Sequence, residues 1–182
     1  MTFLFADVRG STTLAERMSA DEYRQLLDRF YRVASDAVFG ADGAIDKFVG
    51  DEVVAFFIPA FVTGEHARRA VEAAVQLLRA TGHNDPGGPW IPVGAGVHTG
   101  LAWMGAIGDG TRTDLTALGD TVNVTARLAS AALAGEVLVS TAAADAAGLD
   151  LTNRERRTLV LRGKAEATEV VTLSASDVVD KR

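Results

Sequence analysis

Asp7 stands at the junction between an apolar run and a turn rich in glycine and hydroxyl residues. The run from Phe3 has the length of a buried strand, and Gly10-Ser11-Thr12 follows it. A carboxylate at a strand end can bind a divalent cation, and backbone N–H groups opening a helix can bind phosphate oxygens. The stretch therefore suggests a nucleotide site, although Asp7 acting only as a helix cap explains it equally well. We expect Ser11 or Thr12 to be the N-cap of the following helix.

A second carboxylate lies at the tip of an expected β-hairpin. Residues 44–58 read as two strands joined tightly at Gly50-Asp51. Backbone geometry therefore positions Asp51, while Lys47 lies four residues earlier on the first strand. Because these two residues are close in sequence, the spacing alone favours placing them in one site.

An amide and a guanidinium follow on an expected helix that begins at Asp120 or Thr121 and runs to about Leu133. Asn123 and Arg127 are four residues apart, so they point the same way. They could reach into a cleft together, but an ordinary exposed i, i+4 pair fits the spacing better. The buried ridge of this helix should comprise Val124, Leu128 and Ala131.

The remaining elements must hold these residues in place. A capping box at Ser19–Glu22 predicts a long helix that ends near Ala41. Further helices are expected at 65–81 and 141–147, strands at 91–100, 101–108, 136–139, 157–161 and 169–173, a mobile loop at 82–89 and a polar excursion from Asp109 through Asp114.

Composition limits the class of protein. With 182 residues, 48% of them hydrophobic, the chain is long enough for one well-buried domain. It has no cysteine, so disulfides and thiolate metal sites are excluded. A net charge of −6 argues against nucleic-acid binding. The longest apolar run, near Val53 to Val62, is too short to cross a membrane, and no signal peptide is evident, so we expect a cytoplasmic protein.

Four motifs in order carry a resemblance. They are Phe-x-Asp-x-x-Gly-Ser-Thr, Lys-Phe-Val-Gly-Asp, Gly-Asp-x-Val-Asn-x-x-x-Arg and Gly-Lys. From Phe3 to Leu173 the chain resembles the catalytic domain of class III nucleotidyl cyclases, of the bacterial adenylyl cyclase type with Thr at the second purine-reading position. The resemblance implies an α+β fold with an antiparallel sheet, a ferredoxin-like βαββαβ core and flanking helices. It places this domain at 1–174, followed by a polar tail at 175–182 that should fray.

The resemblance also implies an active site and its partners. It implies ATP as substrate, two divalent cations (Mg²⁺ or Mn²⁺) per site, and a head-to-tail homodimer whose two sites are shared between chains. Asp7 and Asp51 match the metal ligands, Asn123 the residue that positions the ribose, and Arg127 the residue that stabilises charge in the transition state. Lys164 matches the lysine that contacts the terminal phosphates, and the backbone of Val8, Arg9, Gly10, Ser11 and Thr12 would cradle the triphosphate. In the family, Lys47 and Asp51 of one chain serve different sites.

Purine choice rests on two positions. Lys47 matches the residue that reads the purine in adenylyl cyclases, and a lysine can donate to N1 of adenine but not to the protonated N1 of guanine. The second position, commonly Asp, is Thr116, whose hydroxyl discriminates less firmly, so some turnover of GTP is compatible with the sequence.

Two other functions remain as alternatives to a metal-dependent adenylyl cyclase. One is a diguanylate cyclase, whose hairpin resembles residues 49–53, although that family has no need of the pattern from Gly119 to Arg127. The other is a catalytically weak or inactive nucleotide-binding or dimerisation module of cyclase descent.

Overall fold

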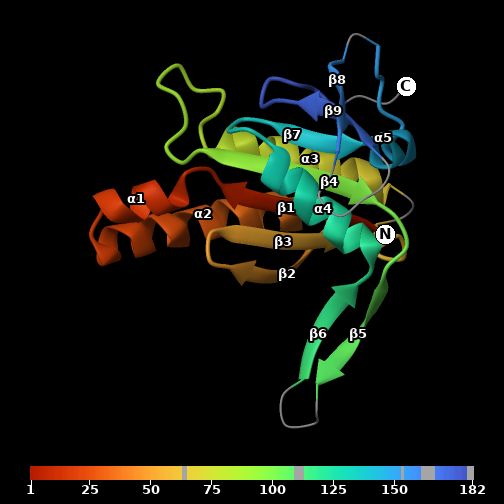
Figure 1. The fold of residues 1–182 in the computed structure, drawn as a ribbon, viewed down its shortest axis with the longest axis horizontal. Helices are drawn as coiled ribbons and strands as arrows, with labels where there is room; N and C mark the ends of the chain where they lie inside the picture. The colour runs from red at the N-terminus through yellow and green to blue at the C-terminus, as the bar shows by residue number, and fades with distance from the viewer. Residues whose placement is uncertain (63–64, 109–112, 153, 161–166, 180–182) are drawn as a thin grey trace.

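The computed structural model describes residues 1–62, 65–108, 113–152, 154–160 and 167–179. A seven-stranded sheet forms the centre, in the order β2-β3-β1-β4-β7-β9-β8 (Figure 1). Its strands are β1 (Thr2–Val8), β2 (Ala44–Val49), β3 (Glu52–Phe57), β4 (Val93–Thr99), β7 (Val137–Ser140), β8 (Arg156–Leu159) and β9 (Thr168–Leu173). The described helices are α1 (Ser11–Arg17), α2 (Ala20–Gly40), α3 (His66–Ala80), α4 (Asp120–Ala131) and α5 (Thr141–Ala147).

The first half of the chain forms the expected ferredoxin-like core. The order β4-β1-β3-β2 is antiparallel throughout, and among the described strands the parallel pair of the sheet joins β4 to β7. Helices α2 and α3 cover one face of this core, and α4 crosses the other (Figure 1). The capping box at the start of α2 forms as predicted, with Ser19 accepting from the backbone of Glu22. The expected α+β fold is therefore confirmed.

Strand β1 is buried on both faces and aims its residues alternately at the two layers. Leu4 and Val8 join the large core beneath α2 and α3, while Phe3 and Phe5 join a smaller cluster with Ala129 of α4. Asp7 continues the row of Phe3 and Phe5 because side chains alternate along a strand. The strand therefore places the carboxylate at its end, on the face that carries α4.

Close approach of α4 to β4 depends on a residue without a side chain. A Cβ on Gly96 would lie 2.4 Å from the backbone nitrogen of Ala129 and 2.8 Å from Cβ of Leu128. We expect Gly96→Ala to lower the free energy of unfolding by about 1–3 kcal/mol through overpacking. Urea denaturation would measure the loss. Gly87→Ala is the matched control, since a Cβ there meets nothing within 4 Å; equal effects at both positions would contradict the prediction.

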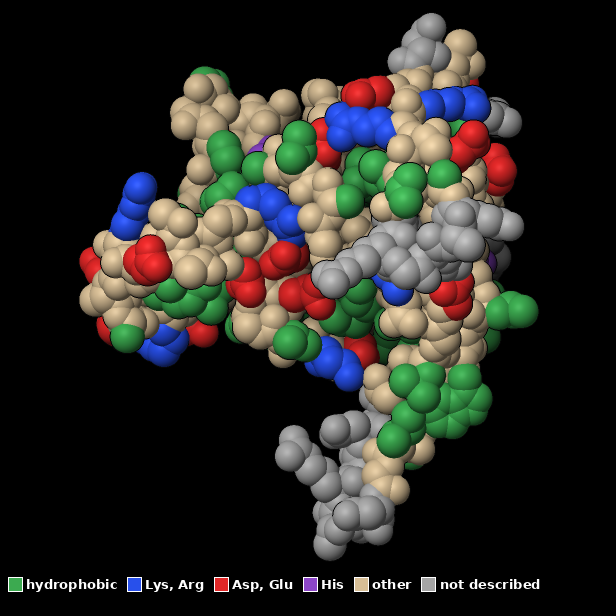
Figure 2. Space-filling view, viewed as in Figure 1, with side chains coloured by type: hydrophobic (Ala, Val, Ile, Leu, Met, Phe, Trp, Pro, Cys, Tyr) green, Lys and Arg blue, Asp and Glu red, His purple; other side chains and the backbone are tan. Residues whose placement is uncertain are grey.

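A two-stranded arm extends away from the main sheet (Figure 1). It consists of β5 (Trp103–Gly108) and β6 (Thr113–Leu118), paired in antiparallel register. The sequence predicted a polar loop where β6 begins. Strand β6 was not recognised because it pairs with β5 alone, and such a strand lacks the run of apolar residues that marks a buried strand. Exposed apolar side chains lie along the arm and at its base, where Figure 2 shows them gathered: Leu101, Trp103, Ile107 and Leu118.

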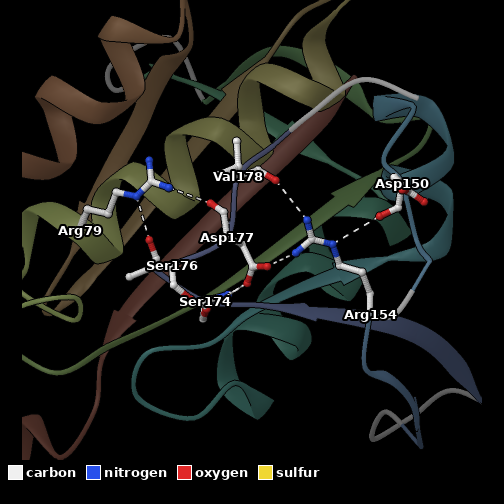
Figure 3. A network of polar contacts seen from close by, with 8 residues as sticks. Arg79, Asp150, Arg154, Ser174, Ser176, Asp177 and Val178 are labelled. Atoms are coloured by element: carbon white, nitrogen blue, oxygen red, sulfur yellow. Dashed lines mark hydrogen bonds and ion pairs between the residues drawn. The ribbon is translucent and has the colours of Figure 1, made fainter.

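The C-terminal tail is held in place as far as residue 179, so the expectation that it frays is wrong for these residues. Arg79 and Arg154 reach it from opposite sides (Figure 3). The Arg79 guanidinium donates to the carbonyls of Ala175 (2.8 Å) and Asp177 (2.7 Å), and Arg154 forms an ion pair with the Asp177 carboxylate. Ala175 is buried and Val179 packs against the main core.

Within the part of the chain that the structure describes, no helix has both the length and the apolar character needed to cross a bilayer.

Candidate nucleotide site

Two carboxylates and a turn surround a cavity of about 300 Å³ at one end of β1. Asp7 comes from the end of that strand, and Asp51 from the β2–β3 turn, where Gly50 has a φ of 61°. The backbone N–H of Val8 donates to the carbonyl of Asp51 at 3.3 Å and joins the two segments. The cavity is lined by the two predicted metal ligands and by the turn predicted to cradle the triphosphate: Asp7, Val8, Arg9, Gly10, Ser11, Thr12 and Asp51.

The turn differs from prediction in its cap. Gly10, in the left-handed conformation with a φ of 68°, is the N-cap of α1, and no side chain caps the helix. The expectation of Ser11 or Thr12 at this position is therefore wrong, because the chain needs a positive φ there that glycine adopts without strain. The first intrahelical bond runs from the N–H of Leu14 to the carbonyl of Gly10 at 3.0 Å. The N–H groups before it have no acceptor within the helix.

Burial and like charge make this an unfavourable place for two ionised carboxyls. Burial raises the pKa of the Asp7 carboxyl, the Arg9 guanidinium opposes that rise, and the Asp51 carboxylate adds to it. Burial also raises the pKa of Glu52, with Asp7 and Asp51 contributing. A divalent cation between Asp7 and Asp51 would relieve this repulsion, and carboxylate oxygens are ligands that Mg²⁺ and Mn²⁺ accept.

The donor set fits such cations only with help from a substrate. The described part of the chain contains no group of three or more His, Cys, Asp or Glu side chains arranged to hold a metal ion. Asp7 and Asp51 alone leave most of an octahedral shell open. Phosphate oxygens could complete that shell, since the cavity is also lined by the turn at Gly10.

The Arg9 side chain has a role that the sequence did not reveal. Its guanidinium forms an ion pair with Asp7 and also donates to the carbonyls of Ser130 (3.2 Å) and Ala132 (3.3 Å) at the C-terminus of α4. The sequence assigned only the Arg9 backbone to the site. Contacts between residues more than 120 positions apart leave no local signal in a single sequence.

Lys47 and Thr116, the two predicted purine-reading residues, contact each other outside the lining of this cavity. The Lys47 ammonium donates to the Thr116 hydroxyl at 3.1 Å and lies 3.3 Å from the Asp46 carboxylate. Tyr31 of α2 supports this hairpin by stacking on Phe48 with ring centroids 4.3 Å apart, and its hydroxyl donates to the Gly50 carbonyl.

The α4 residues lie near the rim of the packed face, as expected. Val124 and Leu128 are buried, Asn123 is exposed and Arg127 is half-buried. Ala131 is exposed and Ala132 is buried instead, because the helix ends at Ala131 and the chain turns there. Among the described residues Arg127 forms no ion pair, so its guanidinium is free to meet an anion.

The predicted site residues therefore do not all meet in one place of the described chain. The cavity lining contains the metal and phosphate residues but none of Lys47, Thr116, Asn123 and Arg127. Lys164 lies outside the described residues.

Comparison with known proteins identifies the class of protein. The family model for the adenylate and guanylate cyclase catalytic domain matches residues 1–174, and the chain belongs to this family. An adenylate cyclase of Anabaena cylindrica is 35% identical over 132 residues, which cover 70% of this chain and 26% of that protein. This chain thus spans about a quarter of the length of that relative.

Two solved structures resemble the whole domain. The guanylyl cyclase Cya2 has a TM-score of 0.84 and 27% identity over 94% of this chain and 89% of that one. The adenylyl cyclase CyaB from P. aeruginosa has a TM-score of 0.80 and 28% identity over all of this chain and 94% of that one.

Proposed function

We propose that this chain is an adenylyl cyclase domain that converts ATP to 3′,5′-cyclic AMP and pyrophosphate at sites shared by two copies. The observation that carries the proposal is that the Lys47–Thr116 pair and the matched residues of α4 all lie outside the lining of the Asp7–Asp51 cavity. Each chain would supply one group to each of two sites. The proposed substrate, a nucleoside triphosphate, favours a cytoplasmic location.

The chemistry follows from the residue types. Asp7 and Asp51 would hold two divalent cations, which when bound lower the pKa of the ribose 3′-hydroxyl and neutralise the triphosphate. The N–H groups at the start of α1 would orient the phosphates. Asn123 of the partner chain would hold the ribose so that its 3′-oxygen faces the α-phosphorus. Arg127 of the same partner chain would donate to the α-phosphate oxygens as their charge grows.

A homodimer accounts for the apolar surface of the arm. Trp103 and Leu118 stand opposite each other at the base of the β5–β6 arm and are half-exposed, with Leu101 next to them. Large apolar side chains gathered in one exposed place mark an interaction surface. A second copy of the chain is the partner that the divided site requires.

Purine choice follows from the donors that the chain presents. Lys47 offers N–H groups to the N1 acceptor of adenine, whereas N1 of guanine carries a proton. The Thr116 hydroxyl can donate or accept, so it adds little discrimination. We therefore expect ATP to be preferred and GTP to be a poor substrate.

Product analysis tests this function. The purified chain would be incubated with Mn²⁺ and either ATP or GTP, at concentrations where sedimentation shows a dimer, and the nucleotides separated by chromatography. Cyclic AMP formed mainly from ATP supports the proposal, and equal products from both nucleotides would indicate a relaxed purine site. A dimer that binds ATP without forming cyclic product would favour the inactive nucleotide-binding module.

A further inference from the structure

Asp46 and Lys47 are neighbours in strand β2, yet their side chains meet. In a regular strand, successive side chains point to opposite faces of the sheet. The register of β2 against β3 shifts here, since Ile45 pairs with Ala55 and Lys47 with the next residue, Val54. Asp46 is thus the extra residue of a β-bulge, a feature that re-aims side chains. The bulge explains the 3.3 Å separation between the Asp46 carboxylate and the Lys47 ammonium.

The two charged groups differ in their exposure to solvent. The Asp46 side chain is only 8% exposed, whereas that of Lys47 is 42% exposed. Among the described residues, Lys47 is the partner of the Asp46 carboxylate. A nearly buried carboxylate without such a partner would be costly, so it restrains the ammonium that pairs with it.

The contacts of the Lys47 ammonium restrain it and still leave it able to donate to a ligand. A lysine ammonium has three N–H groups. One of them donates to the Thr116 hydroxyl at 3.1 Å, and the ammonium forms an ion pair with the Asp46 carboxylate at 3.3 Å. The hydrogen bond and the ion pair together restrict how the ammonium can turn, and a donor held in this way suits an acceptor such as N1 of adenine. Without Asp46, the flexible lysine stem would let the ammonium turn to other acceptors.

We propose that Asp46 is a positioning residue that determines purine specificity through Lys47. From its place in the bulge, Asp46 gives the Lys47 ammonium a negatively charged partner, which the neutral Thr116 hydroxyl cannot provide. This inference rests on the proposed function and adds to it the residue that enforces the choice of adenine over guanine.

The preference of the Asp46→Asn variant for ATP over GTP tests the proposal. The ratio of kcat/KM for ATP to that for GTP should fall roughly tenfold, because the substitution removes the charged partner that restrains the Lys47 ammonium. Asp46→Glu, which keeps the charge, should stay closer to the unmodified chain. Asp145→Asn is the matched control, because Asp145 is exposed on α5 and its loss removes the same charge away from the bulge. Its ratio should not change.

A binding measurement separates this inference from the proposed reaction. The nucleotides 3′-deoxy-ATP and 3′-deoxy-GTP lack the attacking hydroxyl, so calorimetry with Mn²⁺ reports their Kd values without turnover. If the unmodified chain makes no cyclic product, the proposed reaction is overturned. If Asp46→Asn nevertheless loses the preference for 3′-deoxy-ATP over 3′-deoxy-GTP, the proposed role of Asp46 is still supported. Equal loss of both nucleotides, or an unchanged ratio, would show that Asp46 is merely structural and overturn the inference.

Discussion

Asp51→Ala is expected to reduce cyclic AMP formation by about 10³-fold or more, because it removes one of the two carboxylates that line the candidate metal cavity. The loss should appear in kcat at saturating Mn²⁺ and ATP, measured by product chromatography. Asp51→Asn should behave similarly, since its neutral amide keeps the shape of the side chain but not the charge.

The thermal stability of the same variants shows whether loss of metal binding causes their loss of activity. Mn²⁺ with ATP should raise the melting temperature of the unmodified chain, because a ligand that binds only the folded state stabilises it. That increase should be largely lost in Asp51→Ala. Asp28→Ala is a control, since Asp28 is exposed on α2 and pairs with Arg24 instead. If Asp51→Ala retained both turnover and the metal-dependent increase, Asp51 would not be a ligand.

Mixing two inactive variants should restore activity. Asp51→Ala leaves Arg127 intact, and Arg127→Ala leaves the metal cavity intact. If each site takes its carboxylates from one chain and its arginine from the other, a mixed dimer contains one fully intact site. In an equal mixture, half of the dimers are mixed and each has one working site of two, so roughly one quarter of the unmodified activity should return.

The matching negative control places both substitutions in one chain. The double variant Asp51→Ala/Arg127→Ala, mixed with Asp51→Ala, should give no recovery, because no pairing then contains two carboxylates in one chain. Absence of recovery in the first mixture, under conditions where the chains exchange, would mean that each site is built within a single chain.

The sequence predicted the parts of the fold that depend on local chemistry. The Ser19–Glu22 capping box fixed the start of α2, and the turn at Gly50-Asp51 located the β2–β3 hairpin correctly. Strand β6 was missed because its partner is a single strand of the arm instead of a buried sheet. The tail after Leu173 was misjudged because its backbone carbonyls accept hydrogen bonds from arginines far away in the chain.

The candidate site was predictable only as a set of residue types. Motif order identified the two carboxylates and the α4 pair, but it gave no reason to separate Lys47 from Asp51; that separation came first from the family resemblance. The bulge at Asp46 has no signature in the sequence, since it exists only in the register between two strands. The Arg9 contact with the end of α4 is likewise a product of tertiary structure.

The anchored tail defines where this domain can be cut or joined to another protein. Although the family match ends at residue 174, Ala175 is buried and Val179 packs on the main core. A chain shortened to residue 174 would uncover that apolar surface and leave Arg79 and Arg154 without their carbonyl acceptors. A tag or fused domain should therefore be placed after residue 179, so that these contacts are kept.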